Sequence, residues 1–504
     1  MPRRASLETL KGVTLHGLAL AILLWPLAGV EFVPMVDLPG HLAITRVVDD
    51  FLHGKYRDTL QLNLDPIHKP TYVMLYAVFA VLPKGMVGPA AVGLMIALCY
   101  AAVCHSIASL GRRSASSPLV VSLAALVSMF SYSSTFFWGL IPFSLAMPPA
   151  LIAWRAYLEA SGIVDEPPGA TSRTTAPGVV FLMAAVLAHV VHPLSSLFLG
   201  IMLAGAAVPA LAFALGGRAV AGTTTASRGW AVAGPLVAWV LVVGTLQVLT
   251  APPNYDAALA RSAPALLAPF HGTAAARAFL AQIPVELAVV PTRERATTYV
   301  AYPIAVAVLL AASCVLALAG SLMSRPGARS AHTDAPAPVR AGSPVARLAA
   351  VFVVSACVLL FLRHDLLQMG IRALFFPVRA PGFLVFFFAV LAAALLLRLL
   401  ASNRAALPLG SVFVVCALGL AMERSTVLRV HFRAFDQKVH AFFRGDIPDR
   451  YFQSQPFSYG DHIRVYNCYF DATCHDLSRL FFSIYADATI YPVSKKRPPL
   501  DAGT

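Results

Sequence analysis

Charged side chains are scarce in this sequence. Only 12% of the 504 residues are Asp, Glu, Lys or Arg, and 58% are hydrophobic, whereas a soluble globular protein carries about 25% charged residues. A chain so poor in charge cannot cover an ordinary water-facing surface, which excludes a wholly soluble enzyme. The composition predicts a polytopic membrane protein. We therefore attribute the net charge of +14 to the positive-inside rule and expect no nucleic-acid partner.

Several common catalytic and transport signals are also missing. The sequence has no phosphate-binding Gly loop, no nucleophile elbow, no zinc-protease His-Glu motif and no internal repeat. No Asp or Glu falls in the middle of an apolar segment long enough to span a bilayer. Ion-coupled transporters usually place ionisable groups at that depth, so this absence argues against a transporter.

Apolar segments long enough to span a bilayer recur along the whole chain. A spanning helix needs about 20 mostly apolar residues, and about eleven segments meet that length. They lie near 12–32, 86–110, 118–137, 141–158, 177–193, 195–215, 230–250, 300–322, 346–362, 381–400 and 407–422. The apolar stretch Thr71–Pro83 is too short to span and predicts an interfacial or re-entrant helix. The expected fold is an all-α membrane bundle with interfacial helices in its first outer loop.

Basic residues in the short loops predict the orientation. With the N-terminus inside, the inner segments hold 15 Lys and Arg residues against five acids, as the positive-inside rule requires. We expect an uncleaved first span, a cytoplasmic N-terminus and a bacterial-type inner membrane. Residues 1–422 form the predicted multi-pass domain, and residues 423–504 form a small extracytoplasmic α+β tail. The apolar residues of Val427–Phe443 recur at helical spacing with charges opposite, which predicts a helix that emerges from the membrane. The predicted outer loops of the membrane domain are 33–85, 251–299 and 363–380.

Two cysteines in the tail are candidates for a disulfide. Cys468 and Cys474 are six residues apart, a spacing that closes a short loop in an oxidising compartment. A Cys/His metal site that includes His475 is the alternative, although a structural zinc site uses four ligands.

The first outer loop gathers the densest group of acids. Asp37 follows the first span by a few residues, and the turn at Pro39-Gly40 can direct Asp37 and His41 toward one point. The segment His41–Asp49 is amphipathic and predicts a helix lying on the membrane. Asp37 is then either the N-cap of that helix or a carboxylate that takes part in catalysis.

This part of the chain resembles the type C (GT-C) glycosyltransferase superfamily. The resemblance lies in an acid after the first span, a helix on the membrane and a Pro-led apolar helix, His68-Lys69-Pro70-Thr71-Tyr72, before the next span. The segment VDLPGHLA is also similar to "D-x-P-x-H" stretches of bacterial relatives. The resemblance implies a GT-C-like fold and a polyprenyl-phosphate sugar donor. It also implies that Asp37 is the general base or a carboxylate linked to a divalent metal. His41, close to Asp37 in the chain, is a candidate substrate contact in the cavity wall or a second ligand of that metal.

The chemistry of sugar transfer asks for two kinds of group. A base must take the proton of the acceptor hydroxyl, and cations must stabilise the departing phosphate. Asp37 meets the first need. Arg372 and Arg379, in a loop predicted on the same face, meet the second, because a guanidinium binds phosphate through two bonds. The alternative is that these arginines snorkel to lipid head groups.

His189 and His192 lie three residues apart near the outer end of a predicted span. They share one helix face and could line the substrate-binding cavity, with His192 the candidate contact. The alternative is a hydrogen-bonded pair before the helix break at Pro193.

The sequence therefore predicts a membrane glycosyltransferase that moves a hexosyl or pentosyl group from a polyprenyl-phosphate donor to an acceptor on the outer face. Its expected partners are that lipid-linked sugar and membrane lipid. One alternative is a non-catalytic scaffold or accessory subunit of envelope-glycan assembly. Another is a transporter of lipid-linked glycans.

Overall fold

The computed structural model describes about half of the chain. The described residues are 2–35, 38–55, 57–58, 60–62, 87–132, 136, 141–164, 175–216, 225–250, 344–354, 376–402, 407–446 and 493–495. Helices make up nearly all of this part. Their bounds are α1 (Pro2–Leu24), η1 (Trp25–Leu27), α2 (Leu38–Leu52), α4 (Val87–Gly111), α5 (Pro118–Ser128), η3 (Met129–Ser131), α7 (Ile141–Ala160), α8 (Thr175–Val191), α9 (Pro193–Gly216), α10 (Thr225–Thr250), α15 (Phe376–Ser402) and α16 (Leu407–Phe443). Pro344–Val354 is a further short apolar helix.

Four described helices are long and apolar enough to cross a membrane. Their apolar segments are Leu10–Leu27, Gly88–Gly111, Pro193–Phe213 and Gly410–Ala441. They confirm an integral membrane protein built of helices, as the composition predicts. The predicted span 300–322 lies outside the described residues, and the count of eleven spans stays a prediction.

The last long helix extends past the predicted end of the membrane domain. Residue 422 was the expected boundary, yet α16 runs without a break from Leu407 to Phe443. The charged residues Glu423 and Arg424 do not end the helix, and Arg424 is 3% exposed. A helix ends where a breaker or a cap stops it, and α16 has neither Gly nor Pro after Gly419.

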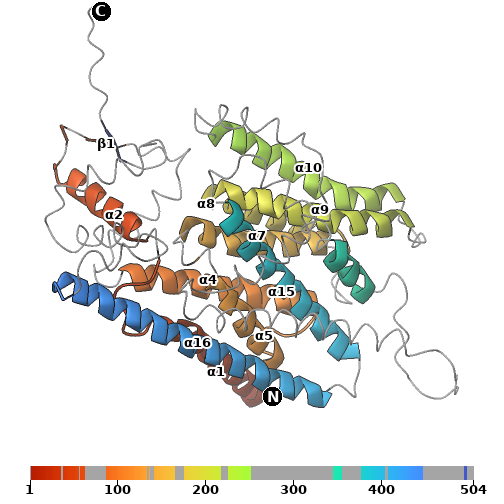
Figure 1. Ribbon diagram of the computed structural model, residues 1–504. Coiled ribbons are helices and arrows are strands. Elements are labelled where there is room, and N and C mark those ends of the chain that lie inside the picture. The colour runs from red at the N-terminus through yellow and green to blue at the C-terminus, as the bar shows by residue number, and fades with distance from the viewer. Residues whose placement is uncertain are drawn as a thin grey trace, which may run out of the picture.

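The first and last long helices lie side by side and run in the same direction (Figure 1). The Ser425 hydroxyl donates to the carbonyl oxygen of Ile22. One turn further along both helices, Arg429 Nη1 donates to the Trp25 carbonyl oxygen at 2.9 Å. The ascending residue numbers on both sides show a parallel pair.

Residues that the sequence predicts on the inner side of the membrane contact one another at one end of the bundle. At one end, the Arg398 side chain donates to the carbonyl oxygen of Leu110, and that of Arg347 donates to the carbonyl oxygen of Gly162. All four residues belong to segments predicted on the inner side. The assignment of this end to the cytoplasm stays a prediction.

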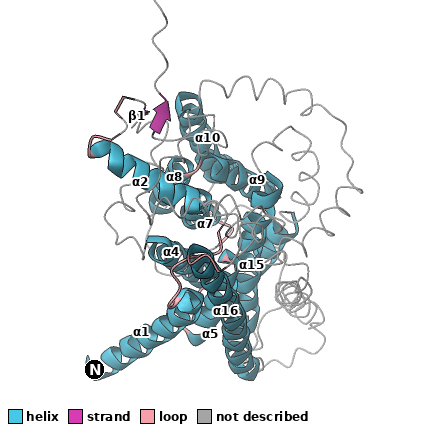
Figure 2. Ribbon diagram, turned by 60° about the vertical axis from the view of Figure 1, so that its left-hand side comes forward, coloured by secondary structure: helices cyan, strands magenta, loops and turns pink. Residues whose placement is uncertain are grey.

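The opposite end carries α2 and a pair of short strands (Figure 1). β1 (Leu60–Leu62) pairs antiparallel with β2 (Val493–Lys495), with Gln61 opposite Ser494. Figure 2 brings this end forward and shows α2 next to β1. The strand pair joins the chain shortly after α2 to its last residues, 431 positions or more away along the sequence.

The tightest packing lies in the middle of the bundle, where α7 meets α4, α8 and α15. Trp154 and Phe387 are both fully buried and meet edge to face, with their ring centroids 5.4 Å apart. Aromatic pairs in this geometry stabilise a core beyond the area they bury. The middle of the bundle is apolar, and the polar contacts gather at its ends.

Candidate functional site

A buried carboxylate holds the chain that leaves α1. Asp436, on α16, is 9% exposed. Its Oδ1 accepts the backbone N–H of Glu31 at 2.9 Å and the backbone N–H of Phe32 at 2.7 Å. Past the end of α1 these two N–H groups have no helical partner, and a buried N–H without one is costly. Asp436 therefore acts as a clamp on residues 31–32.

An imidazole connects this clamp to a second carboxylate. His440 lies one turn after Asp436, and its Nε2 is 3.8 Å from Asp436 Oδ2 and 3.4 Å from Glu31 Oε2. The edge of its ring meets Phe32, with the centroids 5.0 Å apart. The same imidazole nitrogen therefore lies within ion-pair distance of both carboxylates.

Beyond the clamp, the chain packs onto α4 and enters α2. Leu38, the first residue of α2, is fully buried, and His41 is 8% exposed. A side chain added at Gly88, near the start of α4, would place its Cβ 3.4 Å from Leu38 Cδ2 and 3.8 Å from the carbonyl oxygen of Glu31. Both distances are ordinary van der Waals contacts for a Cβ, which shows that the start of α4 lies against both segments. His41, a predicted substrate contact, thus lies in a packed first turn of α2.

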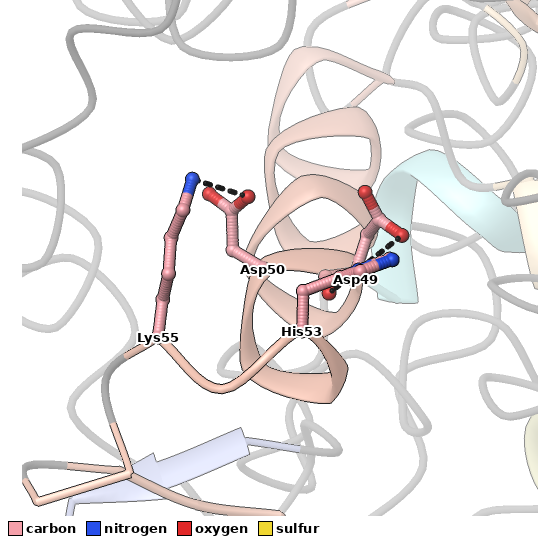
Figure 3. A network of polar contacts seen from close by, with 4 residues as sticks. All are labelled: Asp49, Asp50, His53 and Lys55. Carbon is pink, nitrogen blue, oxygen red and sulfur yellow. Dashed lines mark hydrogen bonds and ion pairs between the residues drawn. The ribbon is translucent and has the colours of Figure 1, made fainter.

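The acids at the other end of α2 have local partners (Figure 3). Asp50 Oδ1 accepts from Lys55 Nζ at 3.0 Å, and His53 Nδ1 is 3.4 Å from Asp49 Oδ1. Gly54 has a φ of 94°, and the N–H of Lys55 donates to the carbonyl oxygen of Asp50 at 2.9 Å. This is the pattern of a glycine C-cap. These charges end the helix and give no separate sign of catalysis.

The two predicted histidines lie at the joint between α8 and α9. His192 Nδ1 accepts the N–H of Leu194 at 3.3 Å, and its ring meets Phe143 edge to face at 5.4 Å. His189 Nδ1 is 3.1 Å from the hydroxyl oxygen of Ser196. This geometry favours the alternative interpretation, in which the histidines are hydrogen-bonded at a helix break.

Most of the other predicted site residues are not described. Asp37, Arg372, Cys468 and Cys474 lie outside the described residues, and of Arg379 only the backbone, in the first turn of α15, lies within them. Their predicted roles, and the neighbourhood of Asp37 with Arg372, stay predictions.

The metal prediction is not tested either. Among the residues that the structure describes, no group of three or more His, Cys, Asp or Glu side chains is arranged to hold a metal ion. Asp37, the first of the two predicted ligands, is not among them. A metal bound through Asp37 and His41 stays a prediction.

Sequence reasoning missed Asp436 and His440. Their spacing of four residues on a helix was visible in the sequence, and it places them on one face. Nothing local pointed to Glu31, because 405 positions separate it from Asp436. The signal that could have indicated Asp436 was an acid in the helical segment that follows the last apolar segment.

Comparisons with protein-family models, with curated proteins and with solved structures gave no match. The site is therefore interpreted from its own chemistry.

Proposed function

We propose that this protein is a GT-C-like membrane glycosyltransferase. It moves a sugar from a polyprenyl-phosphate donor to an acceptor hydroxyl at the membrane surface where α1 ends. In this mechanism Asp37 takes the proton of the hydroxyl, and Arg372 with Arg379 stabilises the phosphate that departs.

The anchoring of the chain on both sides of Asp37 is the observation that carries the proposal. Asp436 holds residues 31–32, and the flanking residues Met35 and Leu38 are 1% and 0% exposed. A general base works only at a fixed distance from the proton that it takes. A loop secured before and after Asp37 suits that role better than a freely solvated loop does.

The location of this loop also suits an amphiphilic donor. Residues 31–35 follow directly on the apolar segment Leu10–Leu27, so they belong near the boundary between lipid and water. A lipid-linked sugar carries its phosphate at that depth. A base there can take the proton of the acceptor hydroxyl while that oxygen attacks the sugar carbon, and the lipid need not leave the bilayer.

The test is sugar transfer by Asp37→Asn compared with Asp58→Asn. Asp58 is an exposed acid of the same loop and serves as the matched control. Purified protein in lipid vesicles is supplied with polyprenyl-phosphate-linked hexoses and pentoses and with an extract of envelope lipids and glycans as acceptor. The release of polyprenyl phosphate that depends on this acceptor is measured. Asp37→Asn should lower the rate about a hundredfold to ten-thousandfold, the usual contribution of a general base, while Asp58→Asn should keep it.

Two outcomes would reject this function. Full transfer by Asp37→Asn would remove the base. The absence of any transfer by the wild-type protein, together with normal assembly of envelope glycan in cells that carry Asp37→Asn, would favour the non-catalytic scaffold.

A further inference from the structure

Two arginines and a tryptophan form a cationic cluster where α1 leaves the apolar part of the bundle. Arg429 Cζ lies 3.7 Å from the centre of the Trp25 ring, and its Nη1 donates to the Trp25 carbonyl oxygen. Arg433 is one turn further along α16. Its Nη2 lies 3.9 Å from the place that a Cβ would take if Gly29 carried a side chain. We call Trp25, Arg429 and Arg433 the rim cluster.

Neither arginine of the rim cluster makes an ion pair with a residue in the described part of the chain. There, the hydrogen bonds of Arg429 go only to Trp25, and Arg433 makes neither a hydrogen bond nor an ion pair with a described residue. Like charges one helical turn apart repel each other. The nearby Asp436 keeps its charge while it accepts two backbone N–H groups, but it makes no ion pair with either arginine.

The apolar lengths of the two helices place the rim cluster at the membrane boundary. The segment Leu10–Leu27 has 18 residues, or about 27 Å of helix, close to the thickness of a hydrocarbon core. The 32-residue segment Gly410–Ala441 is about 48 Å long and must leave the core before its end. Its contact with Trp25 indicates that it does so near Arg429.

We propose that the rim cluster binds the phosphate group of a phospholipid in the leaflet where α1 ends. Trp25 is 41% exposed, and an indole at this depth packs against the glycerol region while its neighbours reach the head group. The guanidinium forks of Arg429 and Arg433 match the oxygens of one phosphate. A bound phosphate would neutralise the pair and join the exit of α1 to α16. The inference does not depend on the proposed glycosyltransferase activity.

The test is lipid retention by the purified full-length protein, measured by native mass spectrometry. Phosphatidylglycerol is added to the wild type, to Arg433→Gln, to the double variant Arg429→Gln/Arg433→Gln and to Lys438→Gln. The control removes one exposed positive charge from the same helix outside the cluster. The double variant should need about tenfold more lipid for equal occupancy, since charge-assisted bonds dominate phosphate binding, and Lys438→Gln should behave as the wild type does.

Competing anions identify the source of the phosphate. Inorganic phosphate and undecaprenyl phosphate are added at the same concentration as the phospholipid, and failure of both to displace it supports the proposal. Displacement by inorganic phosphate would indicate a free-anion site and overturn the assignment, as would a tenfold preference for undecaprenyl phosphate. Equal retention by the wild type and the double variant would also overturn it. If the double variant does not fold, Arg433→Gln decides, because no hydrogen bond or ion pair with a described residue is lost with that side chain.

Discussion

Removing the Asp436 carboxylate should release the segment that follows α1. In Asp436→Ala the N–H groups of Glu31 and Phe32 lose their acceptor. Phe32 is 3% exposed, so water cannot easily replace the carboxylate there. A buried donor left without a partner costs about 1–3 kcal/mol. When the more accessible N–H of Glu31 is included, we expect the local free energy of unfolding of this segment to fall by about 2–4 kcal/mol.

Hydrogen exchange measures this loss where it occurs. Since 1.4 kcal/mol corresponds to about a factor of ten, the amides in residues 28–36 should exchange about thirtyfold faster or more. A peptide from α9 serves as the internal reference for global opening. Asp436→Asn keeps one oxygen acceptor and should show a smaller effect.

Asp446→Ala is the matched control for this experiment. Asp446 pairs with Arg444 just beyond α16, where both side chains are more than half exposed, so its loss should matter by less than about 1 kcal/mol. Unchanged exchange of residues 28–36 in a folded Asp436→Ala protein would refute the clamp. Equal acceleration in the α9 peptide would show that the effect is global and not local.

Two further predictions test the packing and the strand pair. Gly111→Ala should destabilise the bundle by about 1–3 kcal/mol, because its Cβ would lie 2.7 Å from Leu397 Cδ1. Gly17→Ala, at a position with nothing within 4 Å, should not lower the midpoint of thermal unfolding, and equal midpoints for both variants would contradict this packing. In Gln61→Cys/Ser494→Cys, the two paired positions should form a disulfide, since paired strand residues have Cα atoms at disulfide distance. Peptide mapping without reductant should find the two peptides joined, and separate peptides would argue against the pairing.

Long apolar runs gave the most reliable predictions. The expected span 195–215 compares with Pro193–Gly216, and 86–110 compares with Val87–Gly111. Such a run is a local signal, because each residue contributes to the hydropathy of the helix on its own. The amphipathic segment His41–Asp49 also forms a helix, α2, which extends from Leu38 to Leu52.

The helix predicted over Val427–Phe443 is confirmed, since α16 ends at Phe443, but its continuity with the last apolar segment was not predicted, because charge and helix formation are separate properties. Glu423 and Arg424 indicate where the apolar run stops, and the predicted span ended there. A helix continues through charged residues as long as the backbone stays unbroken and one face packs. The first positive φ after the helix is at Gly445, and its position was a better signal of the end.

The clamp lay beyond the reach of sequence reasoning. An acid on a helix near a membrane is ordinarily a solvated group, and nothing beside Asp436 in the chain marks it as buried. Its partners are two backbone N–H groups about 400 positions away. Only the parallel packing of α1 and α16 brings them together, and this depends on the whole bundle.

The clamp on residues 31–32 offers a physical way to distinguish the enzyme from the scaffold. If Asp37 is a base, its rate depends on position to a fraction of an ångström. Asp436→Ala loosens residues 31–32 and should then slow sugar transfer, even though Asp436 has no part in the reaction itself. A scaffold has no such requirement, because binding of a partner over a broad surface tolerates small shifts of one loop. Faster exchange at residues 28–36 combined with slower transfer would therefore connect the clamp to catalysis, whereas faster exchange with unchanged transfer would place the reacting groups elsewhere.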